Sequence, residues 1–127
     1  DGELMEGTTW EYILMISSLK ISNINLFIDV NGLQSSTFSK DTHPTLMPIT
    51  DKLKSFGWET YRCDGNNLKD FSSTLEESEK QMDLPKIIIA DTVKAKGVSF
   101  MEGKNKYHSV KKLPSTEYDQ AMRELDD

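Results

Sequence analysis

The sequence predicts an α/β fold in which a parallel sheet is covered by helices on both faces, giving three layers. Three short stretches rich in β-branched and apolar residues are expected to be strands, at 24–30, 58–63 and 86–91. Stretches with helical spacing of apolar residues are expected to be helices, at 8–20, 49–56 and 68–82. Such alternation is typical of parallel sheets, because right-handed helical crossovers connect parallel strands. We therefore expect one sheet of three parallel strands.

The first helix and the first strand are predicted from apolar spacing and residue type. Apolar residues between 8 and 20 recur near the helical period, Thr8 or Thr9 can cap the start, and Glu11 suits the positive first turn. The stretch 24–30 is short, branched and largely apolar, as expected of a strand that is covered on both faces.

The middle of the chain alternates between polar connections and short regular elements. Residues 34–48 are rich in Ser, Thr, Asp, His and Pro, which predicts an irregular surface loop. The helix 49–56 is expected to end at Gly57, because glycine commonly follows a helix C-terminus. The strand 58–63 then leads into a compact turn at 64–67.

The last third of the chain contains the strongest strand signal. The helix 68–82 is expected to pack through a stripe of four apolar residues, namely Leu68, Phe71, Leu75 and Met82. The run Lys86-Ile-Ile-Ile-Ala-Asp91 predicts a fully buried strand. A loop with four lysines follows, and 115–125 is expected to form a final helix with Ser115 as its cap and Glu117 in its first turn.

Length and composition limit the classes of function. A chain of 127 residues accommodates one domain, and its net charge of −6 argues against sequence-independent binding of nucleic acid. The single cysteine, Cys63, cannot form an internal disulfide and is expected to be a small core residue. The sequence has no long apolar span and no signal peptide, so we expect a cytoplasmic protein that does not enter a membrane.

Two glycine turns are expected to meet at one edge of the sheet. Asp1-Gly2 opens the chain and Asn31-Gly32 follows the first strand, and ligands of open α/β sheets collect outside the carboxyl ends of the strands. A carboxylate, an amide oxygen and a backbone carbonyl of the second loop would suit Mg²⁺ or Ca²⁺ carrying a phosphate. Amides at the start of the first helix favour the same anion. The alternative is that both are ordinary surface turns.

These residues resemble a known signature. Asp1-Gly2, with Asn31 thirty residues later, is similar to the thiamin diphosphate motif of transketolases, and Glu3-Leu-Met-Glu-Gly7 is placed as in that family. Further blocks follow in the family's order, namely Phe56-Gly-Trp58 with Asp64-Gly65, Ile88-Ile-Ala90, Thr92 to Glu102, and Tyr107-His108. The resemblance covers nearly the whole chain and implies part of a thiamin diphosphate-binding fold.

The resemblance implies a cofactor site at this edge. Asp1, Asn31 and the Leu33 carbonyl would hold Mg²⁺ or Ca²⁺, and the residues implied to bind the cofactor itself are Gly2, Glu3, Asn31, Lys94 and His108. For Lys94 the alternative is a solvated basic loop, and for His108 an idle surface position. His43, in the loop 34–48, is given no role.

The resemblance also implies catalytic roles for three residues. His108 matches a family histidine near the diphosphate and the reacting end of the substrate. Glu6 and Glu11 stand where the family places acids that meet across a subunit interface and relay protons toward the pyrimidine side of the cofactor. For Glu11, a solvated position at the helix start is an equal alternative. The carboxylate that activates the cofactor would come from another domain.

The implied function is that of the cofactor-binding part of a transketolase-like transferase, which moves a two-carbon ketol unit between sugar phosphates. The alternatives are a related enzyme, such as a deoxyxylulose phosphate synthase, or a catalytically inert remnant with only an interaction or structural role. The sequence departs from the family pattern on the substrate side, with Asp91 where His is usual, Asn66-Asn67 for His-Asp, Ala95 for Gly and Ser109 for Gly. The sugar specificity therefore stays open.

We expect residues 1–127 to be a partial diphosphate-binding domain that lacks earlier strand-helix units of the family. The pyrimidine-binding domain would lie later in a longer protein or on a separate subunit, so a hetero- or homo-oligomer is expected and this chain alone should be inactive. An apolar helix surface around Trp10, Ile13 and Leu14 is expected to be exposed and ready for a partner. The sequence leaves open whether the chain is a fragment, a truncated product or one piece of a split enzyme.

Overall fold

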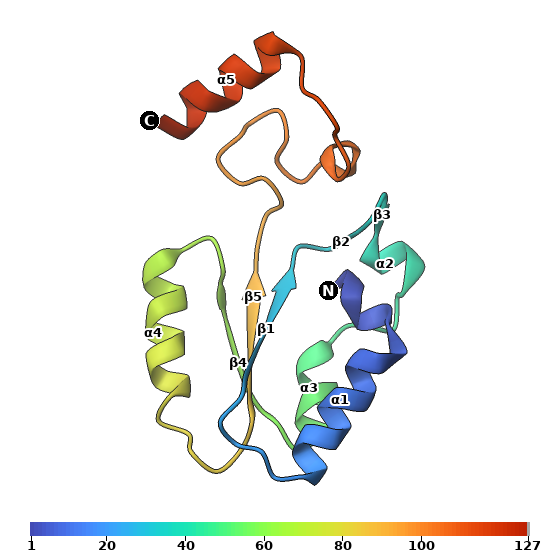
Figure 1. Ribbon diagram of the computed structural model, residues 1–127, viewed down its shortest axis with the longest axis vertical. Coiled ribbons are helices and arrows are strands. Elements are labelled where there is room, and N and C mark those ends of the chain that lie inside the picture. Colours follow the sequence, from blue (N-terminus) through green and yellow to red (C-terminus); the bar gives the residue numbers. More distant parts are fainter. Residues whose placement is uncertain (127) are drawn as a thin grey trace.

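The computed structural model describes residues 1–126, which form three layers, with a central sheet between two layers of helices (Figure 1). The helices are η1 (Gly2–Met5), α1 (Gly7–Ser18), α2 (Ser39–Thr42), α3 (Ile49–Ser55), α4 (Leu68–Ser78), η2 (Asn105–Tyr107) and α5 (Ser115–Asp126). The strands are β1 (Asn25–Val30), β2 (Leu33–Gln34), β3 (Thr37–Phe38), β4 (Glu59–Asp64) and β5 (Lys86–Asp91). None of the helices among these residues is long and apolar enough to cross a membrane.

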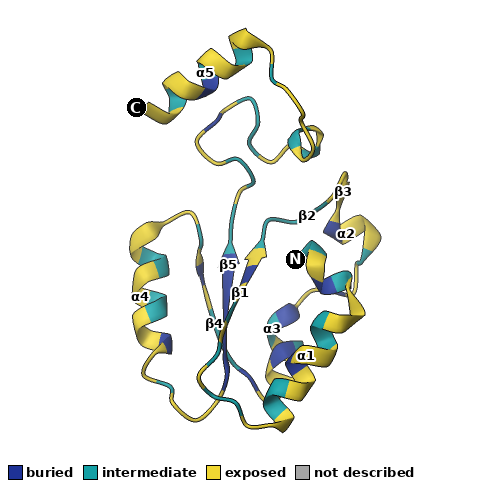
Figure 2. Cartoon of the chain, in the orientation of Figure 1, coloured by how far each residue is buried: buried dark blue, intermediate teal, exposed yellow. Residues whose placement is uncertain are grey.

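The main sheet has the order β1-β5-β4, and both pairs are parallel. The prediction of three parallel strands is therefore confirmed. The strand β5 lies in the middle, and Figure 2 shows it as the most continuously buried stretch of the chain. Helices α1 and α3 cover one face of the sheet and α4 covers the other (Figure 1).

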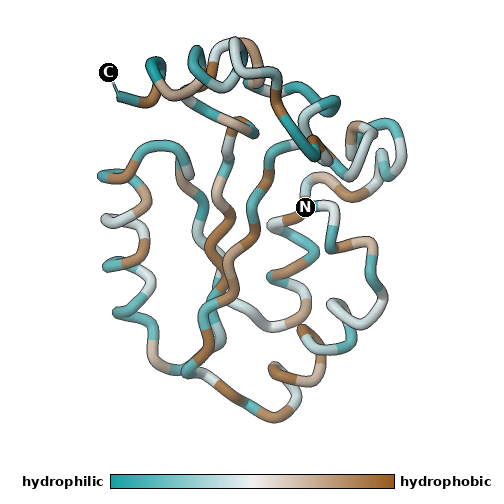
Figure 3. Tube along the Cα trace, turned by 45° about the horizontal axis from the view of Figure 1, so that its top comes forward, coloured by the Kyte–Doolittle hydropathy of each residue, from teal (hydrophilic) through white to brown (hydrophobic). Residues whose placement is uncertain are grey.

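The two faces of β5 face two separate apolar clusters. Ile87 and Ile89 pack with the residues of α1 and α3, whereas Ile88 and Ala90 pack with Cys63 and the partly buried side chains of α4. A continuous apolar run suits this position because both faces of a central parallel strand are covered. Figure 3 shows that the trace is largely hydrophobic in the central strands, and that hydrophobic residues also occur along the helices. Burial raises the pKa of the Cys63 thiol, which agrees with its predicted role as a small core residue.

Helix α1 starts differently from the prediction. It begins at Gly7 with Glu6 as its N-cap, and no side chain caps it. The hydroxyl of Thr9 donates to the Glu3 carbonyl instead, so the capping roles predicted for Thr8 and Thr9 were wrong. The reason is that α1 already begins at Gly7, so Thr8 and Thr9 lie inside its first turn and cannot take the N-cap position. Glu11 lies beyond that turn, so its predicted place in the first turn was wrong as well.

The apolar surface expected around Trp10 and Ile13 is largely covered, which corrects the prediction. Ile13 is 2% exposed, and Trp10 donates through Nε1 to the Leu4 carbonyl at 2.7 Å and packs on Phe56 at a centroid distance of 5.7 Å. The short helix η1 and the end of α3 supply this cover. The prediction is confirmed for Leu14, which is exposed together with Tyr12, Met15 and Leu19.

Residues 34–48 are more regular than predicted. They include most of a β2–β3 hairpin, the one-turn helix α2 and only then an irregular segment. The hairpin closes through a two-residue connection in which Ser35 has a φ of +50°, a conformation that such tight hairpins require. The amide of Ser39 donates to the Gly32 carbonyl at 2.9 Å and ties α2 back to the end of β1.

Helix α4 is shorter than the predicted 68–82. Its start is fixed by Asn67, whose side chain accepts from the amides of Lys69 and Asp70, and it ends at Ser78. Phe71 and Leu75 pack on the sheet as predicted, but Leu68 is 82% exposed and Met82 is 72% exposed. The four-residue stripe was therefore wrong at both ends, because Leu68 begins the helix at the rim of the sheet and Met82 lies beyond the end of the helix.

The C-terminal helix α5 packs on the loop that follows β5. Its start at Ser115 and the position of Glu117 in its first turn agree with the prediction, and it runs one residue beyond the predicted end at 125. Ser115 is the first helical residue, so it does not have the predicted capping position. Val98 of the loop and Ala121 of the helix are both buried. A Cβ atom on Gly97 would lie 3.3 Å from the Leu125 side chain, so the two segments approach closely there. Figure 1 shows this pair of segments beyond the carboxyl ends of the strands.

Candidate functional site

The carboxyl edge of the sheet brings the two glycine turns together. The backbone nitrogen of Asp1 donates to the carbonyl oxygen of Asp29, the residue before the end of β1. Asn31 and Gly32 follow β1 directly, so the first residue of the chain lies beside the turn that ends the first strand. This is the neighbourhood expected for two turns at the carboxyl end of a parallel sheet.

A cavity of about 390 Å³ opens between these turns and the loop after β5. Its lining includes Asp1, Gly2, Glu3, Glu6, Asn31, Leu33, Gln34, Ser35, Lys94 and His108. Its volume is within the range of small-molecule sites. The structure thus gathers eight of the nine sequence-predicted site residues round one cavity. The exception is Glu11, which is exposed on α1 and does not line it.

The carboxylate of Asp1 has one oxygen in use and one free. Its Oδ2 accepts from the hydroxyl of the buried Ser39 at 2.7 Å. Its Oδ1 is buried and has no hydrogen-bond partner among the described residues. A buried carboxylate oxygen without a partner is costly, and a cation at that point would remove the cost. The position of Asp1 therefore fits a metal ligand.

The side chain of Asn31 is fixed by two hydrogen bonds. Its Oδ1 accepts from the amide of Leu33 at 2.9 Å, and its Nδ2 donates to Asp29 Oδ2 at 3.0 Å. An amide oxygen has two lone pairs, so Oδ1 can accept the Leu33 amide and still bind a cation. With the carbonyl of Leu33 in the same turn, the oxygens present are the hard ligands that Mg²⁺ and Ca²⁺ prefer.

Few side chains at this edge can serve as metal ligands. No group of three or more His, Cys, Asp or Glu residues within residues 1–126 is arranged to hold a metal ion. A site made of one carboxylate, one amide oxygen and one carbonyl is nevertheless adequate for Mg²⁺, because this ion commonly takes its other ligands from water and substrate phosphates.

Gly2 stands where the first turn meets the hairpin. A Cβ atom there would lie 3.1 Å from Gln34 Cγ and 3.3 Å from Gln34 Cβ. A glycine therefore lets the backbone of the first turn approach the Leu33–Gln34 strand, and this approach forms one wall of the cavity. Lys94 and His108, from the loop after β5, contribute to the lining and are the residues that can attract an anionic group.

A second hollow of about 350 Å³ shares Asp1, Asn31 and Leu33 with the first. The rest of its wall is mainly apolar and comes from Phe38 of β3 and from the segment after the hairpin, including Pro44, Leu46 and Met47. His43 also lines this hollow, although the sequence analysis gave it no role. The three oxygen-bearing residues thus stand between a polar cavity and an apolar one.

The loop that carries Lys94 and His108 is attached to α5 by Glu124. The carboxylate of Glu124 accepts from the Ser99 amide at 2.6 Å, from the Ser99 hydroxyl at 2.8 Å and from Gln120 Nε2 at 2.7 Å. The bond from Gln120, followed by those from Ser99, lowers the pKa of Glu124 below the usual value for a glutamate. Within the loop, the Gly103 amide donates to the Lys94 carbonyl at 2.9 Å.

Removing this carboxylate should loosen the loop. In Glu124→Ala we expect faster amide hydrogen exchange at residues 96–104 at pH 7, because Ser99 loses both of its acceptors. The folded pKa of Glu124 is depressed, so its contribution is present above the unfolded pKa and is lost as the pH falls through the folded value. The difference between the two proteins should therefore shrink on strong acidification. The matched control is Asp119→Ala, which removes an exposed carboxylate of the same helix; equal exchange in all three proteins would contradict the prediction.

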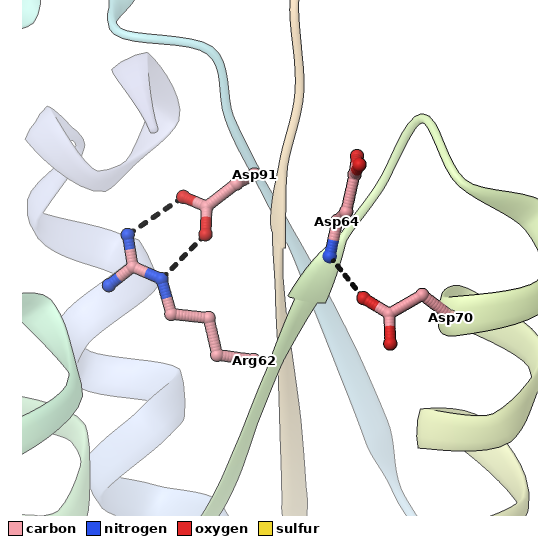
Figure 4. Close-up of polar contacts among 4 residues, drawn as sticks. All are labelled: Arg62, Asp64, Asp70 and Asp91. Atoms are coloured by element: carbon pink, nitrogen blue, oxygen red, sulfur yellow. Dashed lines mark hydrogen bonds and ion pairs between the residues drawn. The ribbon is translucent and has the colours of Figure 1, made fainter.

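The edge formed by β4 and β5 contains a different polar arrangement, shown in Figure 4. Arg62 donates to both carboxylate oxygens of Asp91, at 2.6 and 2.7 Å, and this hydrogen bonding raises the pKa of Arg62. Asp70 accepts from the backbone amide of Asp64 at 2.7 Å. Asp91, where the family usually has His, is thus engaged with a strand neighbour and does not line the cavity of Asp1 and Asn31.

The sequence analysis missed three residues that hold the site together. Ser39 donates to Asp1, and Thr92 and Asn31 both donate to the carboxylate of Asp29. The position of Asp29 two residues before Asn31 was a possible signal. The sequence contains none for Ser39, which lies in a segment predicted to be an irregular loop.

The sequence and the fold of this chain are similar to those of known proteins. Residues 1–125 match the family model described as "Transketolase, thiamine diphosphate binding domain". The chain belongs to this family. The transketolase-type fold is thereby shown, together with thiamin diphosphate binding as the character of the domain.

Similar proteins include separate subunits and whole enzymes. The chain is 38% identical to an apulose-4-phosphate transketolase subunit of Actinobacillus succinogenes, over 100% of this chain and 45% of that protein. It is 32% identical to the 6-deoxy-6-sulfo-D-fructose transketolase subunit SqwG of a Clostridium species, over 99% of this chain and 45% of that protein. It is also 32% identical to human transketolase, over 98% of this chain but 19% of the enzyme. The chain thus spans less than half the length of these relatives.

Solved transketolases share the arrangement of the elements. The structure of transketolase from Campylobacter jejuni superposes with a TM-score of 0.88 at 25% identity, covering 99% of this chain and 19% of that one. A transketolase from Pichia stipitis superposes with a TM-score of 0.86 at 20% identity, covering 99% of this chain and 18% of that one, which shows the fold. The expected thiamin diphosphate-binding fold is therefore confirmed.

Proposed function

We propose that this transketolase-type domain supplies the diphosphate- and metal-binding half of an active site that transfers a two-carbon ketol unit between sugar phosphates. The observation that carries the proposal is the buried, unpartnered Oδ1 of Asp1 beside Asn31, at a cavity whose lining also contains Lys94 and His108. Negative and positive groups at one cavity suit a ligand made of a divalent cation and a diphosphate.

In this proposal the sequence-predicted residues that line the cavity have defined tasks. Asp1, Asn31 and the Leu33 carbonyl would hold Mg²⁺ or Ca²⁺, and the metal would compensate the charge of the diphosphate. Gly2 and Glu3 line the same cavity and would bind the diphosphate. Lys94 and His108 line the same cavity. Lys94 would lend positive charge, and His108 would contact the diphosphate and the reacting end of the substrate.

Bound thiamin diphosphate would supply the carbanion chemistry of the transfer, and the protein would bind and orient it. Glu6 lines the cavity, so it can act on a proton at the rim of the site. Glu11 lies outside the cavity on the exposed side of α1, so its proposed part in a proton relay requires a partner that covers this helix. Neither acid replaces the activating carboxylate, which we assign to a pyrimidine-binding domain or subunit.

The partner surface is proposed to include the outer side of α1. Tyr12, Leu14, Met15 and Leu19 are between 49% and 62% exposed there. Large apolar side chains that gather on one helix are typical of an interface. The strand β1 also forms one edge of the sheet in the described part of the chain. Two of the similar proteins are named as transketolase subunits, which supports assembly with a second chain, as a hetero- or homo-oligomer.

Calorimetry tests the proposal directly. Thiamin diphosphate is titrated in the presence of Mg²⁺, first into this chain and then into its complex with a pyrimidine-binding subunit. Binding that depends on Mg²⁺ and is absent with thiamin, which lacks the diphosphate, is the expected result. No binding to either sample would favour the inert remnant and overturn the proposal. Cytoplasmic localisation stays a prediction.

The role of His108 can be separated from that of the metal ligands in the same complex. Asn31→Ala should weaken Mg²⁺-dependent binding, because it removes a hard oxygen ligand. His108→Ala should lower turnover more than affinity if this residue acts on the substrate. Sugar phosphates that serve as donor and acceptor distinguish a transketolase from a deoxyxylulose phosphate synthase-like enzyme, which the substitutions alone cannot do.

A further inference from the structure

Asp29 connects three segments of the chain at the carboxyl edge of the sheet. Its Oδ1 accepts from the hydroxyl of Thr92, and its Oδ2 accepts from Asn31 Nδ2 at 3.0 Å. Its backbone carbonyl accepts from the nitrogen of Asp1. Both carboxylate oxygens are therefore engaged with the protein, which suits a residue that holds its neighbours better than one that binds a ligand itself.

These contacts determine how Asn31 is oriented. The bond to Asp29 fixes the nitrogen end of the amide, and the bond from the Leu33 amide fixes the oxygen end. An amide that is held at both ends cannot turn over, so its oxygen stays on the side of the Leu33 turn. The same residue, Asp29, holds the backbone of Asp1 and thereby the start of the turn that carries the other proposed metal ligand.

Thr92 is itself held from two sides. Its amide donates to the Val30 carbonyl at 3.1 Å, which continues the parallel pairing of β5 with β1 by one residue. On the other side lies Gly65, where a Cβ atom would be 2.6 Å from Thr92 Cγ2 and 2.8 Å from Ala90 Cβ. The methyl group of Thr92 thus packs against a glycine that has no room for a side chain, while its hydroxyl donates to Asp29.

We propose that Asp29 and Thr92 are positioning residues for the cation site, acting through Asn31 and Asp1. The central strand would in this way set the geometry of ligands that come from the first strand and the first turn. The inference rests on the proposed function, since it concerns the same cation and diphosphate. Outer residues that orient metal ligands typically change metal affinity by about 10- to 100-fold when they are replaced.

The test uses Thr92→Val, which keeps the shape of the side chain and removes the donor. Affinity for thiamin diphosphate with Mg²⁺ is measured by calorimetry in the sample in which the wild-type chain binds. We expect a loss of about 10- to 100-fold, and Thr92→Ser should restore most of it. Asp29→Asn should show a comparable loss, because an amide nitrogen in place of one oxygen cannot accept from both partners.

The matched control is Thr60→Val on β4. The hydroxyl of Thr60 is buried without a hydrogen-bond partner among the described residues. The replacement therefore exchanges a hydroxyl for a methyl group in the same sheet, as Thr92→Val does, but breaks no hydrogen bond. Its affinity should equal that of the wild type. Thermal unfolding without ligand reports a merely structural role, and we expect Thr92→Val to shift the midpoint no more than a few degrees.

The outcomes separate this inference from the proposed function. If the wild type binds and Thr92→Val binds equally well, or if its weaker binding is matched by a large loss of thermal stability, Asp29 and Thr92 are not positioning residues and the proposed function stands. If the wild type does not bind in any sample, both are overturned. Weaker binding at unchanged stability, with rescue by serine, supports the inference.

Discussion

Replacing Asp1 with alanine is expected to weaken Mg²⁺-dependent binding of thiamin diphosphate by about 100-fold or more. Replacing a residue that only orients a metal ligand already lowers metal affinity by about 10- to 100-fold, and Asp1 is proposed to be a ligand itself. Asp1 provides the charged oxygen of the proposed set, and its Oδ1 has no other partner among the described residues. Without the carboxylate, the diphosphate charge is less compensated. Calorimetry at saturating Mg²⁺ measures the loss.

Two variants make this result specific. Asp1→Asn keeps an acceptor for the Ser39 hydroxyl but removes the charge, so its loss should be smaller than that of alanine. Asp41→Ala removes an exposed carboxylate of the nearby helix α2 and should leave binding unchanged. If Asp1→Ala binds the cofactor as the wild type does, the metal is held elsewhere and the assignment of Asp1, Asn31 and Leu33 fails.

The largest effect on stability is expected for a leucine in the core between α3 and the sheet. Leu53 is 0% exposed, and Leu53→Ala should lower the free energy of unfolding by about 2–5 kcal/mol through lost burial and a residual cavity. Leu68→Ala makes the same chemical change in α4, where the side chain is 82% exposed, and should change it by no more than about 0.5 kcal/mol.

Denaturant unfolding followed by circular dichroism checks both values, with the slope of the transition as a test that the unfolded states are alike. Equal destabilisation by the two leucine variants would show that the packing of α3 described above is wrong. A total loss of structure in Leu53→Ala agrees with the prediction, because a small domain has only a few kcal/mol to lose.

The regular part of the fold could be predicted because the sequence pattern and the final environment agree. The run from Lys86 to Asp91 is apolar on both faces, and it became the central strand, which is the place where such a run is stable. Helix ends were predicted less well. The sequence around Leu68 shows helical spacing, yet spacing does not show where the sheet beneath it ends.

The hairpin and the cover of Trp10 could not be predicted for a related reason. Both depend on contacts between segments that are polar or short, such as the bond from Trp10 Nε1 to the Leu4 carbonyl. A surface loop and a tight hairpin have similar compositions, so 34–48 looked irregular until its backbone pairing was seen. The conformation of residues 34–48 and the burial of Trp10 are therefore determined by tertiary contacts and not by local propensity.

The sequence pointed to eight of the residues that line the cavity, and their roles stay predictions, whereas it did not point to the residues that hold Asp1 and Asn31 in place. Asp1 and Asn31 could be singled out because each precedes a glycine in an expected turn, and because Asn31 follows the first expected strand. The bond between Thr92 and Asp29 joins residues 63 positions apart and follows from the strand order. The strand order was not predicted, and without it no reasoning along the chain connects these two side chains.

The strand order also has a consequence for how the chain acquires its structure. Within residues 1–126, strands β1 and β4 do not pair with each other, and each pairs only with β5, which is the last of the three in sequence. The described sheet therefore has no stable two-stranded precursor before residue 86 is available, and its pairings close long loops. Folding that depends on such non-local contacts is slow compared with that of helical domains, and the described three-stranded sheet can form only once β5 is available.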